Sequence, residues 1–502
     1  MTPIDQFLNE IYKSINLFRP EAALVITFLA ALIFDLIFKK SKNISGYIAL
    51  IGFAVTAVLL FQQNASVPKP SFIFMLAVDP FAKFFKYIIL FTSFLIILMS
   101  FLSDELYKEN RRLGEYFTLI VGMTFGMFLL VGATNMIMIY LAIETMSLSS
   151  YVLAGYTKEI KRASEASLKY VIFGAVSSGI MIYGISILYG LTGTLNLYGI
   201  SMTIMRGGVN SFGLIASGLM IIAGIGYKIS AVPFHFWTPD VYEGSPITIT
   251  AYLSVASKAA GFAVLIRFLE VVFPGGVANM QKDIAGVDWK IVIAVLSVLT
   301  MTLGNLVALW QTNLKRLLAY SSIAHAGYML MGVVVMNKIG ASAVMTYFFF
   351  YMFMNLGAFL VVMLFANKIG SEDIEDYSGI GYRSPILGVC MVIFLLSLTG
   401  IPPTAGFIGK YVIFQAVLDS GHQWVWLAVV GVLNSVVSLF YYVKIFRNMF
   451  IRGVDTEQEP LEFSPASIIM LFVLVIPTLV FGLYFGPVVN WATESMKLFF
   501  AF

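Results

Sequence analysis

The 502-residue sequence contains a single cysteine, Cys390, and few charges, since Asp, Glu, Lys and Arg make up only 12% of it. One cysteine excludes an intrachain disulfide, a CxxC pair and an iron–sulfur cluster held by this chain alone. The net charge is +4, and no run of basic residues extends beyond Lys39, Lys40 and Lys42. We therefore expect no nucleic acid among its partners.

The motifs of nucleotide binding, covalent catalysis and metal coordination are also missing. We find no GxGxxG, no GxxxxGK[ST], no nucleophile motif and no metal cluster. The sequence predicts that this chain binds no cofactor or metal and carries no catalytic residue of its own.

Hydrophobic residues, by contrast, make up 59% of the chain, and the charged share is about half that of a soluble domain. A bilayer span requires about 20 apolar residues. The apolar runs predict an all-α polytopic protein of the lipid bilayer with fourteen transmembrane helices, at residues 20–38, 44–62, 80–101, 115–132, 135–155, 167–190, 211–231, 247–272, 289–310, 317–336, 341–366, 385–418, 424–446 and 465–486.

Basic residues are distributed unequally between the two sets of loops. The loops after helices 1, 3, 5, 9, 11 and 13 contain Lys39, Lys40, Lys42, Lys108, Arg111, Arg112, Lys158, Lys161, Arg162, Lys315, Arg316, Lys368, Arg383, Lys444, Arg447 and Arg452. The other side has only Lys13, Arg19, Lys69, Arg206, Lys282, Lys338 and Lys497. An even number of helices places both termini on one side, and the positive-inside rule predicts that this is the non-cytoplasmic side.

Proline interrupts two of the predicted helices. Pro233, followed by Pro239 and Pro246, breaks one, and Pro402 with Pro403 breaks the other. Pro233 and Pro403 are 170 residues apart, which corresponds to five helices, and an odd number of helices makes two such units inverted. Paired broken helices indicate a transport site at mid-membrane depth.

This spacing predicts four segments. They are an N-terminal three-helix segment (1–110), a first five-helix repeat formed by helices 4 to 8 (111–275), a second, inverted five-helix repeat formed by helices 9 to 13 (285–450), and a C-terminal segment with helix 14 (451–502).

Ionisable residues inside these spans are the main candidates for function. A lysine at a helix centre opposes membrane insertion by about 2.5 to 3.5 kcal/mol, and Lys228, Lys258 and Lys410 all lie in apolar stretches. Lys228 precedes Pro233 by five residues, so we expect that carbonyl groups freed by the break, and water, can accept its hydrogen bonds. Glu144 is expected to pair with a lysine of another helix, and its movement would switch Lys228 between charged and neutral forms.

The remaining candidates follow from position. Lys258 is placed at the middle of its helix with Ser254 one turn earlier, Lys410 opens the second half of a broken helix, and His325 is a candidate proton relay. His235, Asp240 and Glu243 lie in the connector after Pro233 and are expected to shape the cytoplasmic mouth of a proton path.

Structural interpretations of these residues stay open. Glu144 can be a packing carboxyl bonded to Ser147 or Ser149, Lys228 can snorkel to the interface, Lys410 can neutralise a neighbouring carboxylate, and His325 can be a satisfied packing residue. Lys83, Lys86 and Arg267 lie near helix ends and are interpreted as interfacial anchors.

Five long motifs resemble one family. YLAIETMSLSSYVLAGY, AVPFHFWTPDVYEGSP, LSVASKAAGF, NLKRLLAYSSIAHAGYML and GIPPTAGFIGKYVIFQAV are similar to subunit N of bacterial NADH:quinone oxidoreductase, respiratory complex I. The resemblance implies a proton-translocating membrane-arm subunit of this translocase in the bacterial cytoplasmic (inner) membrane. It assigns Glu144 and Lys228 to a charge pair, Lys258 and His325 to a central hydrophilic axis, and Lys410 to the exit side.

The resemblance also implies the surroundings of the chain. NADH, FMN, iron–sulfur clusters and quinone would be bound by partner subunits, and the neighbours would be a sister antiporter-like subunit and small membrane subunits. The alternatives are a subunit of a Mrp-type cation/proton antiporter, which needs no redox partner, and a purely structural scaffold.

Overall fold

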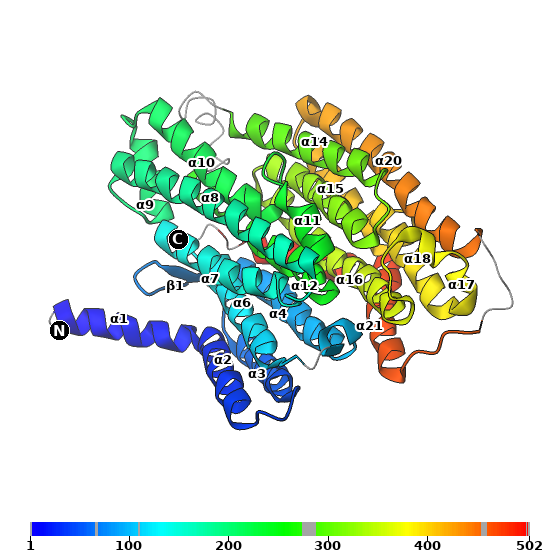
Figure 1. Ribbon diagram of the computed structural model, residues 1–502. Coiled ribbons are helices and arrows are strands. Elements are labelled where there is room, and N and C mark those ends of the chain that lie inside the picture. The colour runs from blue at the N-terminus through cyan, green and yellow to red at the C-terminus, as the bar shows by residue number, and fades with distance from the viewer. Residues whose placement is uncertain are drawn as a thin grey trace.

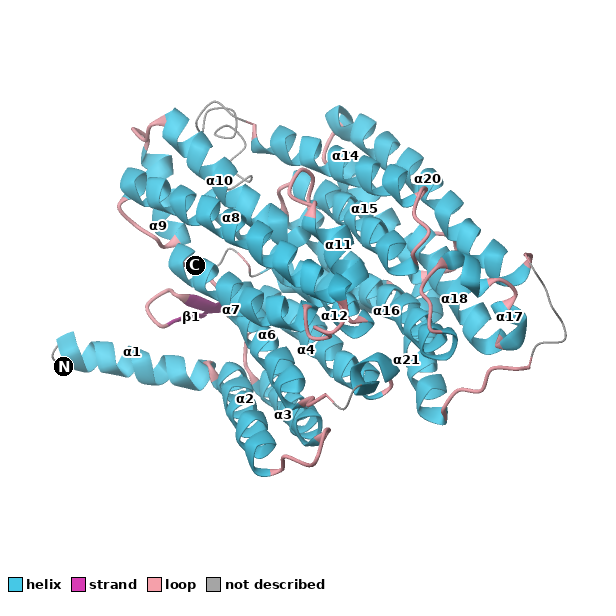
Figure 2. Ribbon diagram, viewed as in Figure 1, coloured by secondary structure: helices cyan, strands magenta, loops and turns pink. Residues whose placement is uncertain are grey.

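The computed structural model describes residues 3–65, 69–108, 111–273, 288–452, 459–497 and 499, and these residues are almost entirely helical (Figures 1 and 2). Thirteen helices in the described residues are long and apolar enough to cross a membrane. The remaining predicted span, the twelfth at residues 385–418, is occupied by two shorter helices, α18 (Pro385–Thr399) and α19 (Ala405–Asp419). The predicted all-α polytopic fold is confirmed.

The long helices lie close to the predicted residues. They are α2 (Arg19–Ile37), α3 (Ile44–Gln62), α4 (Pro80–Phe101), α6 (Gly114–Gly132), α7 (Met136–Ala154), α8 (Lys161–Thr192), α10 (Ser211–Ile229), α12 (Ile247–Tyr252) continuing into α13 (Lys258–Val272), α14 (Trp289–Ala308), α15 (Leu314–Val334), α16 (Lys338–Ile369), α20 (Val425–Phe450) and α21 (Pro465–Leu483). A π-helical turn, Leu253–Ser257, joins α12 to α13.

Several short elements were not predicted, because each is shorter or more polar than a bilayer span. They are α1 (Pro3–Leu17), α5 (Asp104–Tyr107), α9 (Leu197–Arg206), α11 (Trp237–Gly244), α17 (Ile380–Arg383), α22 (Gly486–Lys497), the 3₁₀ turns Ile374–Tyr377 and His422–Trp424, and an antiparallel pair of strands, β1 (Lys69–Ser71) and β2 (Leu76–Val78). In this pair Lys69 lies opposite Val78.

Helix ends follow ordinary capping chemistry. Asn135 and Asn313 are the N-caps of α7 and α15, and each side chain accepts a hydrogen bond from a backbone N–H of the first turn. The 32-residue helices α8 and α16 both end at a left-handed glycine, Gly193 and Gly370, a conformation that a side chain disfavours. The two halves of the chain thus use the same caps in the same order.

Both proline breaks are present. α10 ends at Ile229, a cis peptide bond joins Val232 to Pro233, and α11 begins at Trp237. In the other half α18 ends at Thr399, and α19 begins after the cis Pro402–Pro403 bond.

Two isolated strand bridges repeat the same connection in the two halves. Asn135, before α7, pairs with Asn196, after α8, and Asn313, before α15, pairs with Asp373, after α16. The first bridge lies at the start of α4, because Ala133 pairs with Leu76 in β2. The second lies at the other end of α4, where Asn367 donates to the Leu102 carbonyl over 2.7 Å.

The opposite placement of these bridges supports a proposal that two inverted five-helix units occupy residues 111–275 and 285–450. The boundary between these units, and Lys282, lie outside the described residues.

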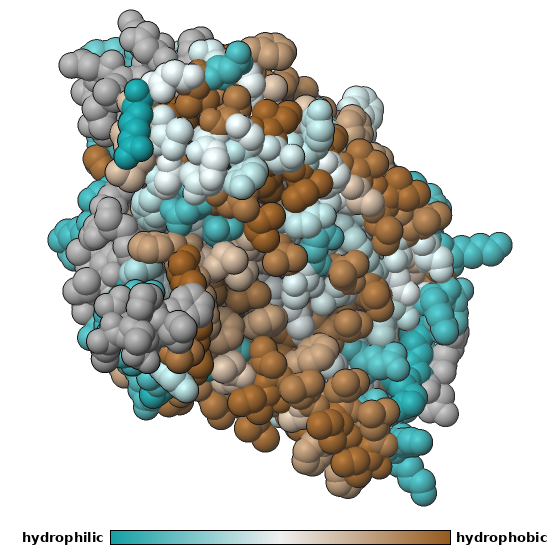
Figure 3. Space-filling view, turned by 90° about the vertical axis from the view of Figure 1, so that its left-hand side faces the viewer, coloured by the Kyte–Doolittle hydropathy of each residue, from teal (hydrophilic) through white to brown (hydrophobic). Residues whose placement is uncertain are grey.

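The most deeply buried helices form the centre of the molecule. The segment Ile247–Val272 is wholly buried, and α15 and α16 are almost wholly buried, whereas α2, α3 and α21 expose most of their residues. Hydrophobic residues gather in the lower part of the face seen in Figure 3, at the level where α2 and α3 lie in Figure 1. Apolar surface on outer helices suits contact with lipid tails, while the central helices are available for polar groups.

Candidate functional site

Lys228, in the last turn of α10, is enclosed by aromatic rings. Its Nζ atom is 5.6, 5.3 and 5.5 Å from the ring centroids of Tyr151, Tyr170 and Tyr227, and the residue is only 2% exposed. Among the residues that the structure describes, its ammonium has no hydrogen-bond partner. Tyrosine faces attract cations, so the rings offset part of the cost of removing this charge from water. The burial excludes a lysine that snorkels to the interface.

The carbonyls freed by the break are already occupied, so the expectation that they accept hydrogen bonds from Lys228 is wrong. The Gly226 carbonyl accepts the Ala231 N–H over 2.8 Å. The Tyr227 carbonyl accepts the indole N–H of Trp237 over 2.9 Å. The connector after α10 therefore folds back, and its N–H groups cap the C-terminal end of α10.

Glu144 on α7 is half-buried and accepts a hydrogen bond from Ser178 on α8. The hydroxyls of Ser147 and Ser149 instead donate to backbone carbonyls of their own helix. Glu144 and Lys228, both described, form no ion pair in this structure. The Tyr151 ring, on the same helix as Glu144, faces the Lys228 ammonium, so α7 reaches the Lys228 site although the predicted partners form no ion pair.

Lys258 lies directly after the π-helical turn and is 2% exposed. Its Nζ donates to the Ser322 carbonyl over 2.9 Å and also to the Ser322 hydroxyl. Ser254, the predicted neighbour, accepts instead from Asn355 over 2.6 Å. A π turn changes the rotation of the helix after it and is frequent at functional sites.

Lys258 and Lys228 belong to neighbouring helices that pack closely. Gly261, one turn after Lys258 on α13, lies against α10, and a Cβ atom there would be 2.7 Å from the Ile229 side chain and 3.6 Å from the Lys228 Cβ. The missing side chain lets the two helices approach.

His325 on α15 is fully enclosed by tyrosines. Its Nδ1 is 2.5 Å from the Tyr347 hydroxyl, and its Nε2 is 3.3 Å from the Tyr442 hydroxyl. Tyr442 is in turn 2.5 Å from the Ser321 hydroxyl. Both ring nitrogens therefore have partners that can donate and accept protons. The charges of Lys258 and Lys410 also act on His325.

Lys410, on α19, donates a hydrogen bond to a carbonyl at its proline break, as was expected of Lys228 at the other break. Its Nζ donates to the Thr399 carbonyl at the end of α18 over 2.8 Å and to the Ser435 hydroxyl over 3.2 Å. It also lies 4.5 Å from the ring centroid of Tyr328. In the described residues it has no carboxylate partner, so it does not neutralise a neighbouring acid.

One face of α15 connects these groups. Ser322, His325 and Tyr328 follow one another at intervals of three residues, so they lie on the same side of the helix about 4.5 Å apart along its axis. Ser322 contacts Lys258, and Tyr328 contacts Lys410. The structure thereby brings Lys258, His325 and Lys410 to one buried face of α15, and Lys228 lies on α10, which packs against α13 at Gly261, one turn after Lys258.

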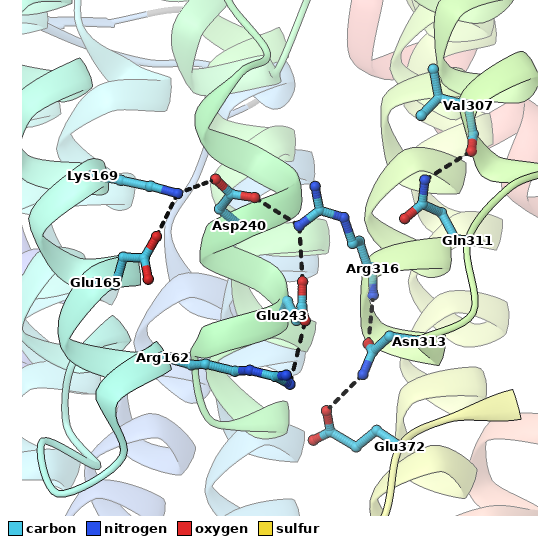
Figure 4. Close-up of polar contacts among 10 residues, drawn as sticks. All are labelled: Arg162, Glu165, Lys169, Asp240, Glu243, Val307, Gln311, Asn313, Arg316 and Glu372. Atoms are coloured by element: carbon cyan, nitrogen blue, oxygen red, sulfur yellow. Dashed lines mark hydrogen bonds and ion pairs between the residues drawn. The ribbon is translucent and has the colours of Figure 1, made fainter. Parts of the chain in front are cut away.

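Asp240 and Glu243 belong to an ionic network that links both halves of the molecule (Figure 4). Asp240 accepts from Lys169 on α8 over 2.6 Å and from Arg316 on α15 over 2.7 Å. Glu243 accepts from Arg316 over 2.8 Å and lies 3.5 Å from Arg162. The network borders a polar pocket of about 160 Å³. That this pocket is the mouth of a proton path stays a prediction.

His235 is not part of this network. It is 4% exposed, and its Nδ1 has no hydrogen-bond partner in the described part of the chain. No group of three His, Cys, Asp or Glu residues is placed to hold a metal ion in the described ranges. That this chain binds no cofactor stays a prediction.

A second polar pocket, of about 310 Å³, lies beside α5. Glu105 in this pocket accepts the backbone N–H of Ile247, the first residue of α12, over 3.4 Å. Burial raises the pKa of the Glu105 carboxyl above its ordinary value, Glu372 acts in the same direction, and Lys315 opposes both.

The comparisons with known proteins agree with this architecture. Residues 133–438 match the family model described as NADH:quinone oxidoreductase/Mrp antiporter, TM. NADH-quinone oxidoreductase subunit N 2 of Chloroherpeton thalassium is 48% identical over 501 residues, which are 99% of this chain and 97% of that protein. The chain belongs to the NADH:quinone oxidoreductase/Mrp antiporter transmembrane family. The predicted resemblance to subunit N is confirmed.

Solved members of the family share the fold. A chain of respiratory complex I from Thermus thermophilus with bound Aureothin is 29% identical, with a TM-score of 0.78 over 94% of this chain and 99% of that chain. A chain of the Mrp complex from Dietzia is 18% identical, with a TM-score of 0.81 over 97% of this chain and 98% of that chain. At this identity the Mrp likeness shows the fold alone, so the Mrp alternative is the weaker one.

The prediction that Arg267 and Lys86 are interfacial anchors is wrong. Arg267 is completely buried, forms two hydrogen bonds with Asp79 (2.8 and 3.1 Å) and donates to the Val131 carbonyl over 3.1 Å. Lys86 is also buried and pairs with Glu21. In both cases the acid lies on another segment, so the position of the base at a helix end did not indicate its surroundings.

The sequence also left several contact residues unassigned. Tyr227 directly precedes Lys228, but the other tyrosines that contact Lys228 and hydrogen-bond His325 come from other helices, α7, α8, α16 and α20. In the sequence, only the three-residue spacing of Ser322, His325 and Tyr328 indicated that these side chains share one face of a helix.

Proposed function

We propose that this chain is the proton-translocating membrane-arm subunit of an NADH:quinone oxidoreductase, in which other subunits transfer electrons from NADH to quinone. A relative that is 48% identical along nearly the whole length of both chains bears the name of subunit N of that enzyme. The observation that carries the proton-moving role is the buried line of Lys258, Ser322, His325, Tyr328 and Lys410, which continues across both halves of the molecule.

The proposed route begins at the Asp240 and Glu243 mouth and passes to Lys228 and Lys258. From there Ser322 and His325 lead toward Lys410. Lys258 donates to the Ser322 hydroxyl, Ser322 lies one helical turn before His325, and Tyr328, one turn further, contacts Lys410. The steps into and out of Lys228 are part of the proposal alone, since its ammonium has no hydrogen-bond partner in the described residues. His235 lies in the connector between the mouth and α10 and is assigned an accessory role.

Glu144 acts in this proposal as a movable counter-charge. In the structure it is held by Ser178 and not by Lys228. When it approaches, the charged form of Lys228 is favoured, and when it withdraws, the tyrosine-lined site favours the neutral form and releases a proton to Lys258.

The energies are compatible. At an effective dielectric constant of 20, two unit charges 4 Å apart interact by about 4 kcal/mol. Moving one proton against 100 mV requires about 2.3 kcal/mol. A change in the Glu144 to Lys228 distance therefore changes their interaction energy by enough to transmit the energy that one proton requires.

The energy itself would come from outside the chain. We assign NADH, FMN, the iron–sulfur clusters and quinone to partner subunits, and the neighbours to a sister antiporter-like subunit and small membrane subunits. The chain would lie in a bacterial cytoplasmic membrane, with both termini on the non-cytoplasmic side, where the basic loops are fewer.

Co-purification tests membership in this enzyme. An affinity-tagged form of the full chain, extracted in mild detergent, is expected to bring down subunits that oxidise NADH and hold iron–sulfur clusters. Recovery of only antiporter subunits, together with cation/proton exchange in vesicles without NADH, would favour the Mrp-type alternative.

A further inference from the structure

An open groove lies away from the proton route, at the end of α4 where Pro80 begins the helix. Its volume is about 990 Å³, at the upper end of the range of about 300 to 1,000 Å³ for small-molecule sites. The C-terminal end of α3, the first half of α4, the middle of α16 and α22 form its walls.

The groove is polar at one end and apolar at the other. Lys83, Tyr87 and Phe91 follow each other on α4 at intervals of four residues, so they lie on one face and span about 12 Å along the helix. Gln62 and Gln63 at the end of α3 lie at the Lys83 level. Because Pro80 starts the span, Lys83 lies at interfacial depth and Phe91 at the depth of lipid tails.

Aromatic residues form the deeper wall. The Phe91 ring is 5.9 Å from that of Phe353, and the Tyr87 ring is 5.9 Å from that of Trp491. Phe349 lies 5.4 Å from Phe353 and 6.0 Å from Trp491. This surface matches an acyl chain in both polarity and depth.

Lys83 carries a charge that no acid balances within the described residues. Its Nζ donates to the Phe61 carbonyl over 3.2 Å and to the Gln63 carbonyl over 2.7 Å, and no Asp or Glu lines the groove. Lys86, one turn further along α4, is buried and paired with Glu21. The chain thus neutralises Lys86 internally and presents Lys83 to the groove.

We propose that this groove binds an anionic phospholipid, whose phosphate lies at Lys83 and whose acyl chain lies along Tyr87, Phe91 and Phe353. An ammonium with two carbonyl partners keeps one donor and its full charge for a phosphate. Tyr87 and Trp491 lie between the polar and apolar ends, as aromatic residues do at membrane interfaces. The site is independent of the proton route, so it stands even if the proposed function fails.

The test uses the intact complex in vesicles that contain a phosphatidylglycerol with a photoreactive group in its acyl chain. Labelling is expected in peptides that contain Phe91 or Phe353. Lys83→Gln should lower labelling about fivefold, the factor that corresponds to about 1 kcal/mol for one basic residue at a membrane surface. Lys83→Arg should retain it, and Lys69→Gln, which removes an exposed charge on the nearby strand β1, is the matched control.

Three results would overturn the proposal. They are equal labelling in Lys83→Gln and the parent chain, equal labelling by a phosphatidylcholine probe, and cross-linking of the groove to a partner subunit in place of lipid. If Lys83→Gln does not assemble, competition in the parent complex decides the question. Unlabelled phosphatidylglycerol should then displace the probe more effectively than phosphatidylcholine does, and equal displacement would contradict the proposal.

Discussion

At the scale of single residues, the buried lysines are stabilised in three different ways. Tyrosine rings surround Lys228, Ser322 holds Lys258 through two oxygens, and the Thr399 carbonyl accepts from Lys410. None of the three has a carboxylate partner in the described residues. A lysine without a fixed counter-ion loses its proton more easily than a paired one, because only its own desolvation and distant charges decide its state.

The phenol groups around His325 provide the first residue-scale prediction. Tyr347→Phe removes only the hydroxyl that lies 2.5 Å from Nδ1 and leaves the ring in place. If this hydroxyl relays protons, the ratio of protons pumped to NADH oxidised should fall severalfold, while quinone reduction with an uncoupler stays within about twofold. Tyr411→Phe, on an exposed tyrosine of α19, should have no effect, and an unchanged ratio in Tyr347→Phe would remove this residue from the route.

Glu105 gives a prediction about pH. Its pKa in the folded chain is raised, so its favourable contribution is complete below the unfolded value of about 4.3 and is lost as the pH rises through the folded value. Glu105→Gln imitates the protonated form. Thermal unfolding in detergent should therefore show the stability of the variant rising relative to that of the parent as the pH increases above about 4.3, and a parallel pH dependence of the two would contradict this account.

At the scale of elements, the apolar runs were sufficient to place the long helices. The predicted bounds of α3 and α4 are the observed ones, because these runs are uniformly apolar and are limited by polar residues. α8 begins six residues before its predicted start, since polar residues such as Lys161 and Glu165 remain helical beyond the apolar stretch. The π-helical turn before Lys258 has no comparable sequence signal.

The partners of buried residues could not be predicted in the same way. Arg267 and Asp79 are 188 residues apart in the chain, and only the packing of α13 on α4 brings them together. The carbonyls beside Lys228 were expected to be free, yet Trp237 in the connector takes one of them. The position of a residue in the sequence predicts its depth in the membrane. Its contacts depend instead on how the helices pack.

The second proline break provides a prediction for an element. Gly400 has φ +88°, and a Cβ atom there would lie 2.9 Å from the Lys410 side chain. Gly400→Ala should therefore strain the backbone by about 1 to 2 kcal/mol and also displace Lys410, with loss of proton pumping. Gly193→Ala has the same backbone strain at φ +68° with no atom near its Cβ. Equal pumping in the two variants would show that the position of Lys410 does not matter.

At the scale of the whole molecule, polar groups run through the most buried helices. The ionic network of Asp240 and Arg316 links α11 of one half to α15 of the other, and α15 carries the line from Lys258 to Lys410. At one end of this line Lys410 contacts the carbonyl that ends α18 at the second proline break, and at the other end Lys258 follows the π-helical turn. A purely structural scaffold would not need lysines without a carboxylate partner in these helices. If the chain were such a scaffold, removing these lysines would leave the coupling of proton pumping to quinone reduction intact.

The most direct test of the account is the number of protons pumped per NADH in an assembled complex that carries Lys228→Ala, reconstituted into vesicles. The account predicts a lower ratio while NADH oxidation with an uncoupler continues, because the first buried lysine of the route is missing. Pumping at the parent ratio, with assembly and quinone reduction intact, would contradict it.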